Sequence, residues 1–261
     1  MTDNKCVLAF MAHPDDVEFT CGGTLALLHR RGWEIHIATM TPGDCGSEQL
    51  GPEEISEIRR VEAANAAAVL GGQYHCLECR DGLIAYDRET TIKAVGLVRK
   101  VRPRLVFALG PNDYLIDHEV SSAVVRNAAF FVGVPNLKTE PFRPFRPVPH
   151  LYYADPVELK DMFGRPVDPT VVVDVTSVID TKSQMLGCHA SQRDWLLKQH
   201  GMDEYVHAML AMGEKRGKLI GVKYAEGFRQ HLGHGYPQDN LLAAELGPLV
   251  HVQEGLNREQ A

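Results

Sequence analysis

The chain has 261 residues, of which 44% are hydrophobic, and a formal net charge of −7. This length suits one large α/β domain with a sizeable core, so we expect a single domain over residues 1–261. The sequence has no dense basic patch, which argues against a nucleic-acid partner, and no apolar run long enough to cross a membrane.

The cysteine content and the first residues bear on the compartment. Six cysteines in a chain of this length do not form a disulfide framework, and the N-terminal residues lack the pattern of a secretory signal. We therefore expect reduced thiols and a cytoplasmic protein. Cys76 and Cys79 have a C-x-x-C spacing, but a zinc ribbon needs a second such pair, which the sequence lacks.

The predicted elements alternate between strand and helix over most of the chain. Short apolar runs between turn residues predict strands at 6–12, 34–40, 73–78, 104–109, 149–154 and 170–175. Helical periodicity predicts helices at 24–32, 52–70, 89–101, 119–130, 177–192 and 195–217. This order indicates an α/β fold with a Rossmann-like, mostly parallel sheet and helices on both faces.

Two connecting segments have distinct compositions. Cys21-Gly22-Gly23 is predicted to be a turn before the first helix, and residues 131–149, rich in Pro, Phe and Arg, are predicted to be a long surface loop. No G-x-G-x-x-G motif follows any predicted strand, which argues against a dinucleotide-binding protein.

The first predicted strand ends in residues that suit metal chemistry. His13, Asp15 and Asp16 follow it directly, at the edge of the sheet where α/β proteins bind ligands. His13 and Asp16 offer donors for zinc, and Asp15 would remain free to take a proton from water. A catalytic zinc site has three protein ligands, and His118, after another strand, is the best candidate for the third. Alternatively, an Asp caps the next helix and His13 is a surface residue.

The same stretch carries a resemblance to a known family. The sequence AHPDD at 12–16, followed by Glu18 and by GGTL at 22–25, resembles the AHPDDE signature of the LmbE/PIG-L family. Members of this family are zinc-dependent deacetylases of N-acetylglucosaminyl compounds. The resemblance extends to about Gln192 and implies a hydrolase that removes an N-acetyl group from a small amino-sugar conjugate.

The resemblance assigns roles to the residues of this motif. It implies that His13, Asp16 and His118 hold the metal and that Asp15 is the general base. Zn²⁺ is the expected cofactor, although Fe²⁺ or another divalent cation suits the same nitrogen and oxygen donors.

Further residues match the family outside the first motif. Arg59 and Glu62 match an R-x-x-E pattern whose Arg contacts the substrate beyond the sugar; alternatively they form a solvated ion pair. Asp81 matches an Asp that binds sugar hydroxyls, although Asp-Gly is also a common turn. Gly43 belongs to a loop that resembles one lining the family's pocket, or is a plain connector.

The segment around His118 departs from the family pattern. His118 and Asp117 match the end of an H-P-D-H pattern in which the Asp supports the metal centre, consistent with carboxylates that orient metal-bound imidazoles. Leu115, however, stands where the family has a His that stabilises the oxyanion and handles its proton. Losing one oxyanion donor typically costs about 10²–10³ in rate, so we still expect an enzyme.

Three interpretations of Leu115 remain open. Another residue substitutes, and the candidates are Tyr114, His75, His231 and His234. The enzyme is slower, or the protein binds a metal or sugar with little or no turnover.

The last part of the chain is less informative. Residues 224–229 resemble the family's closing Y-A-E-x-F segment. His231 and His234 have a spacing that suits a second metal or, alternatively, an arm that contacts a neighbouring copy. We expect a homo-oligomer. His189 either lies near the pocket or is a buried, hydrogen-bonded imidazole, and Lys182 is expected to be structural.

Overall fold

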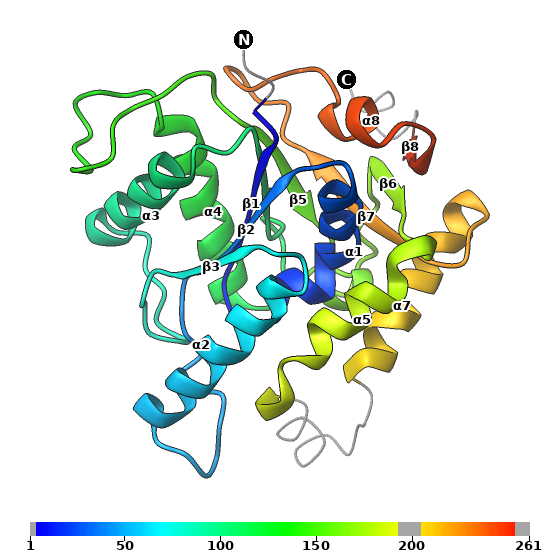
Figure 1. The fold of residues 1–261 in the computed structure, drawn as a ribbon, viewed down its shortest axis with the longest axis horizontal. Helices are drawn as coiled ribbons and strands as arrows, with labels where there is room; N and C mark the ends of the chain where they lie inside the picture. Colours follow the sequence, from blue (N-terminus) through cyan, green and yellow to red (C-terminus); the bar gives the residue numbers. More distant parts are fainter. Residues whose placement is uncertain (1–3, 193–204, 254–261) are drawn as a thin grey trace.

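An eight-stranded sheet forms the centre of the computed structural model, which describes residues 4–192 and 205–253 (Figure 1). The strands are β1 (Cys6–Met11), β2 (Glu34–Thr39), β3 (Gln73–Cys76), β4 (Leu105–Ala108), β5 (His150–Ala154), β6 (Val171–Asp174), β7 (Ala225–Gln230) and β8 (Val250–Val252). Their order is β3-β2-β1-β4-β5-β7-β6-β8. The first five strands are parallel, whereas β7 is antiparallel to β5 and β6, and β8 is antiparallel to β6. The prediction of a mostly parallel sheet is confirmed.

Helices cover both faces of this sheet, as predicted. They are α1 (Asp16–Arg30), α2 (Pro52–Ala68), α3 (Arg88–Val101), α4 (Ile116–Phe131), α5 (Ile179–Gly187), α7 (Tyr205–Ile220) and α8 (Leu241–Leu246). Figure 1 shows α3 and α4 on one side of the parallel strands and α1, α2 and α5 on the other. The first ten residues of the predicted helix 195–217 lie outside the described residues. Within the described ranges, no helix combines the length and the apolarity that a membrane span needs.

The position of the candidate site follows from the strand order. From β1 the chain runs to β2 and β3 on one side, then returns to β4 on the other side of β1. In sheets of this kind, ligands bind where the strand order reverses, outside the carboxyl ends of the strands. His13 follows β1 and His118 follows β4, so the topology brings both side chains to this crevice.

Helix α1 begins at Asp16, so the prediction of a turn at Cys21-Gly22-Gly23 is wrong. These residues lie inside the helix because α1 packs closely against the end of β6. A Cβ atom on Gly23 would lie 2.8 Å from the Val175 side chain. The glycine therefore permits close packing and does not mark a turn.

A buried carboxylate fixes the same part of α1. Glu226 of β7 accepts hydrogen bonds from the backbone N–H groups of Gly23 and Thr24 at 2.8 and 2.7 Å. Lys182 of α5 donates to Glu226 at 2.6 Å, which neutralises the buried charge. Lys182 is structural, as the sequence predicted.

The second half differs from the prediction in one element. The predicted helix 177–192 is interrupted, since α5 ends at Gly187 and helical residues resume at 190–192. The segment that resembles the family's Y-A-E-x-F motif forms β7. The loop 131–149 has no helix beyond Phe131 and no strand, as predicted. It is anchored by the buried Arg99, whose guanidinium donates to the carbonyls of Val132 and Leu137.

Candidate active site and metal centre

Three candidate metal ligands converge at the carboxyl ends of β1 and β4. His13 follows β1, Asp16 is the first residue of α1, and His118 lies in the first turn of α4. One ligand atom of each lies within 4.8 Å of the others. His118 Nε2 is 3.4 Å from Asp16 Oδ1, and His13 Nδ1 is 3.5 Å from Asp16 Oδ2. The structure thus brings together the three residues that the sequence singled out.

Carboxylates orient both imidazoles. His118 Nδ1 lies 2.9 Å from Oδ1 of the buried Asp113, which leaves Nε2 facing Asp16. His13 Nε2 lies 3.1 Å from Asp81 Oδ1 and 3.3 Å from Asp117 Oδ2, which leaves Nδ1 facing Asp16. Histidines that bind metals usually donate their second ring N–H to such a partner. Asp117 therefore supports His13 rather than its sequence neighbour, and Asp113, which sequence reasoning missed, supports His118.

The donors and the charge of this cluster suit a divalent cation. Two imidazole nitrogens and one carboxylate oxygen are typical zinc donors, and three protein ligands leave one position open. Burial alone would lower the pKa of His13, but hydrogen bonds to Asp117, Asp16 and Asp81 raise it well above its usual range. Burial alone would also lower the pKa of His118, but the nearby carboxylates of Asp16 and Asp113 raise it above its usual value. The cluster attracts positive charge, which a bound cation would supply in place of protons.

Asp15 lies next to this cluster in an unusual backbone conformation. Its φ is 109°, in a region that residues other than glycine rarely adopt and that is common at functional sites. It occupies the N-cap position of α1, but its side chain makes no capping hydrogen bond. Burial raises the pKa of Asp15, Arg59 lowers it, and Asp16 raises it again. Capping does not explain this residue, and a raised pKa suits a general base.

Arg59 is enclosed behind Asp15. Its side chain is buried and its Nη2 donates to the Pro14 carbonyl at 2.8 Å and lies 3.4 Å from Asp15 Oδ2. Its Nη1 donates to the Gly43 carbonyl, and a Cβ atom on Gly43 would overlap the guanidinium. Glu62 instead accepts from the backbone N–H and the hydroxyl of Ser191. The alternative of a solvated Arg59–Glu62 ion pair is therefore wrong.

Comparison with known proteins identifies the family. Residues 8–129 match the protein-family model PIG-L, described as GlcNAc-PI de-N-acetylase. The conserved protein TT1542 from Thermus thermophilus is 31% identical and superposes with a TM-score of 0.72, over 88% of this chain and 96% of that one. The chain belongs to the PIG-L (LmbE-like) family.

Other relatives of this PIG-L protein carry functional names. The N,N′-diacetylchitobiose deacetylase from Pyrococcus horikoshii is 27% identical, with a TM-score of 0.75 over 90% of this chain and 88% of that one. The 4-oxalmesaconate hydratase from Pseudomonas putida is 24% identical and aligns with 87% of this chain and 90% of its own length. Homologues of this chain are therefore deacetylases of N-acetylglucosamine-type substrates, together with a hydratase.

Asp81 connects a third loop to the candidate metal centre. Its Oδ2 lies 3.4 Å from the backbone N of Cys45, while its Oδ1 contacts His13. The side chain is 15% exposed. The next residue, Gly82, donates its backbone N–H to Asp117 at 2.7 Å. Binding of sugar hydroxyls by Asp81 stays a prediction, and its support of His13 is a second role that the sequence did not indicate.

Leu115 has a backbone role in this structure. It is the N-cap residue of α4, and its N–H lies 3.3 Å from Asp113 Oδ1. The adjacent Tyr114 stands at the mouth of the site, 58% exposed, with its ring edge-on to His118 at a centroid distance of 5.4 Å. Burial of the hydroxyl group itself, followed by the charges of Asp16 and Asp113, raises the pKa of Tyr114, so the hydroxyl keeps its proton and can donate a hydrogen bond.

The other candidates to replace the missing His contact residues elsewhere. His75 Nε2 is 3.0 Å from His36 Nδ1, and His231 Nδ1 is 3.0 Å from the Tyr153 hydroxyl. In the described part of the chain, no group of three potential ligand atoms includes His231 or His234. A second metal at that pair has no support from the geometry.

His189 and Gln192 support the site from the interior. His189 is fully buried, with Nε2 3.4 Å from Glu18 Oε2, but neither ring nitrogen has a hydrogen-bond partner in the described structure, so only the burial in the alternative of a buried, hydrogen-bonded imidazole is confirmed. Gln192 donates to the Gly46 carbonyl at 3.0 Å and so holds the loop that also contacts Arg59.

Proposed function

We propose that this PIG-L protein is a divalent-metal-dependent hydrolase that removes an N-acetyl group from an amino-sugar conjugate. The convergence of His13, Asp16 and His118, with Asp15 beside them, carries this proposal. The named activity of the Pyrococcus relative supports an N-acetylglucosamine-type substrate. Zn²⁺ is the proposed cofactor, and Fe²⁺ suits the same donors.

The protein's own residues have distinct tasks in the proposed reaction. His13, Asp16 and His118 hold the cation, which when bound supplies Lewis-acid chemistry for the amide carbonyl and for water. Asp15 takes a proton from the water that attacks the carbonyl carbon. The C–N bond then breaks, and Asp15 returns the proton to the leaving amine, so that acetate and a free amino sugar result. Arg59 holds the carboxylate of Asp15 in place.

The donor that replaces the family's His is proposed to be Tyr114. Its exposed ring next to His118 supports this assignment. A Tyr114→Phe variant should lose about 10²-fold in kcat, as expected for one oxyanion donor, and should keep its metal. Unchanged kcat would return the choice to a slower enzyme without such a donor or to a binding protein with little turnover.

The test is release of acetate and free amine from N-acetylglucosamine conjugates, with and without added zinc or a chelator. Asp15→Asn should retain the metal and lose at least about 10² in rate, whereas His118→Ala should lose the metal. Asp180→Asn, an exposed carboxylate on α5, is the matched control. If both site variants keep full metal content and activity, the proposed site is wrong.

A second candidate is hydration of a carbon–carbon double bond. The near full-length match to a 4-oxalmesaconate hydratase favours including it. The two reactions are separated by giving the same metal-loaded preparation 4-oxalmesaconate and following the loss of its ultraviolet absorbance. Hydration without acetate release from any conjugate would replace the deacetylase proposal.

The proposed homo-oligomer is tested separately by light scattering.

A further inference from the structure

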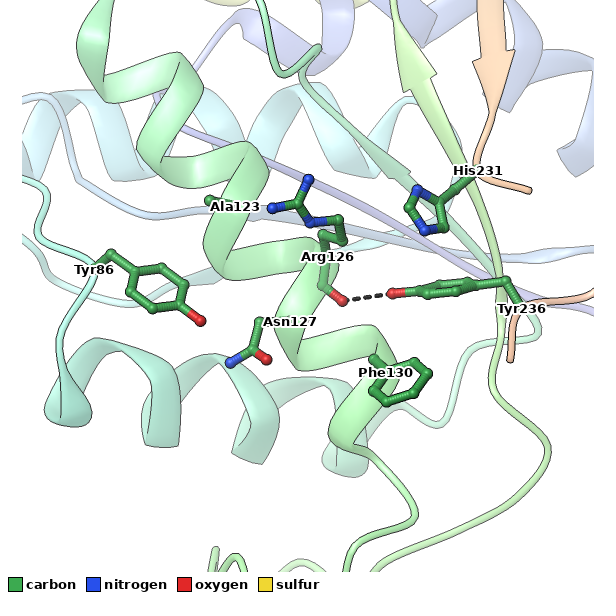
Figure 2. A pocket seen from close by; sticks show the side chains of 7 residues that line it. All are labelled: Tyr86, Ala123, Arg126, Asn127, Phe130, His231 and Tyr236. Carbon is green, nitrogen blue, oxygen red and sulfur yellow. Dashed lines mark hydrogen bonds between the residues drawn. The ribbon is translucent and has the colours of Figure 1, made fainter. Parts of the chain in front are cut away.

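A second pocket lies beside α4, away from the candidate metal centre. Its volume is about 490 Å³, within the range of small-molecule sites. Figure 2 shows aromatic rings, those of Tyr86, Phe130 and Tyr236, around the polar side chains of Arg126, Asn127 and His231. Arg126 lies eight residues after His118 on the same helix, about 12 Å along its axis.

Positive charge is in excess around this pocket. Arg126 is exposed and forms no ion pair among the described residues. Burial raises the pKa of the Tyr153 hydroxyl, and the positive charges of Arg126 and Arg229 lower it, which places both guanidiniums near this group.

Arg229 has two buried donors without partners. Its Nε and Nη2 are buried and have no hydrogen-bond partner in the described structure. The nearby carboxylate of Asp155 accepts from Arg216 Nε at 2.6 Å through Oδ2, while its Oδ1 is also buried without a hydrogen-bond partner in the described structure. Arg229 does not line the pocket, so it adds positive potential near Tyr153 and leaves direct contact with an anion to Arg126.

The walls of the pocket are already fixed by contacts within the chain. The Tyr236 hydroxyl donates to the Arg126 main-chain carbonyl at 2.6 Å, and the Phe130 and Tyr236 rings lie 5.7 Å apart. His231 is held by the Tyr153 hydroxyl at 3.0 Å. Ligand binding would therefore need little ordering of the protein, which favours affinity.

We propose that this pocket binds an anionic small molecule, with a carboxylate or phosphate on Arg126 and a ring or apolar face against the aromatic side chains. A guanidinium matches the oxygens of both groups by paired hydrogen bonds. The site is separate from the candidate metal centre, because none of the lining side chains is His13, Asp16 or His118. The proposal does not depend on the deacetylase reaction.

The experiment is calorimetric titration with inorganic phosphate and, separately, with succinate. It is done on metal-loaded protein and on chelator-treated protein, and the expected result is binding of at least one anion, with a Kd of about 1 mM or tighter, in both forms. Arg126→Gln should weaken binding roughly tenfold or more, because hydrogen bonds between charged groups are strong. Arg126→Lys should lose less, since it keeps the charge.

The control is Arg143→Gln, an exposed arginine on the loop 131–149 that makes the same charge change away from this pocket. Preference for phosphate or for succinate would support the proposal and name the ligand class. Binding that needs the metal, binding unaffected by Arg126→Gln, or a Kd clearly weaker than about 1 mM for both anions would overturn it. A changed molecular mass of Arg126→Gln with unchanged anion affinity would also overturn it, in favour of a contact between copies.

Discussion

The carboxylate of Asp113 should control metal affinity without touching the metal. It lies 2.9 Å from His118 Nδ1 and is 1% exposed, so the hydrogen bond is shielded from water. Replacing Asp113 by alanine removes the partner of His118 Nδ1, so the imidazole can rotate, and it leaves a cavity where the carboxylate was. A hydrogen bond to a charged group contributes about 1.5–3 kcal/mol, and loss of such a partner typically weakens metal binding about 10–100-fold.

The assay is competition for Zn²⁺ with a chromophoric chelator at neutral pH. The Zn²⁺ affinity of Asp113→Ala should be about 10–100-fold weaker than that of the parent chain. Asp113→Asn should lose less affinity, because its amide oxygen still accepts a hydrogen bond from His118 Nδ1–H. Unfolding by urea is measured in parallel on the metal-free proteins, which separates ligand orientation from general destabilisation. The matched control is again Asp180→Asn.

One result would refute this reasoning. If Asp113→Ala binds Zn²⁺ within about twofold of the parent chain, while His118→Ala has lost binding, then His118 is positioned by its helix alone. The Asp113 contact would then serve the loop before α4, where it also faces the N–H of Leu115.

Three further predictions concern packing and pH. In urea unfolding, Gly43→Ala should destabilise the protein by about 2–3 kcal/mol, because its φ is 76° and the added Cβ would overlap the buried Arg59 guanidinium. The control Gly32→Ala, at φ 80° with no atom nearby, should cost about 1 kcal/mol. Equal costs would refute the overlap. Gly23→Ala should lower the free energy of unfolding by about 1–3 kcal/mol, because its Cβ would clash with the Val175 side chain. Gly22→Ala, whose added Cβ would be no closer than 3.4 Å to its nearest neighbour, should be neutral or stabilising by up to about 1 kcal/mol. A larger loss of stability for Gly22→Ala than for Gly23→Ala would contradict the packing described for α1. Burial and two nearby basic side chains lower the pKa of His75 to about 4, so below pH 6.5 the unfolded chain binds a proton that the folded chain does not. The free energy of unfolding should therefore fall by about 1 kcal/mol between pH 6.5 and 4. In urea titrations His75→Gln should reduce this fall, and an unchanged dependence of stability on pH would exclude His75 as its source.

The main site could be predicted because parallel topology makes distant residues neighbours. His13 and His118 each follow a short apolar run, and strands of one direction end at one edge of a sheet. That argument needs only the order of elements, so their convergence with Asp16 was predictable from the sequence. The same holds for the mostly parallel sheet itself.

Other features depend on side-chain geometry that no sequence pattern specifies. Asp113 has no fixed spacing rule that marks it as the partner of His118. Arg59 and Glu62 are three residues apart, which predicts a surface pair, yet each is buried with a different partner. Strand β7 contains Glu226, a residue that a strand pattern treats as exposed, and only Lys182 and the start of α1 explain its burial.

The Glu226 contact with α1 has a consequence for how the chain reaches its native state. It joins residues 203 positions apart, and β7 lies between β5 and β6 although it follows both in the sequence. Contacts of such long sequence separation form late, because a large loop must close first. During synthesis, the helix that begins with Asp16 therefore gains its hydrogen bonds to Glu226 only after nearly the whole chain has been made. Loss of the last strands would then disturb the candidate metal centre from behind, although none of its ligands comes from them.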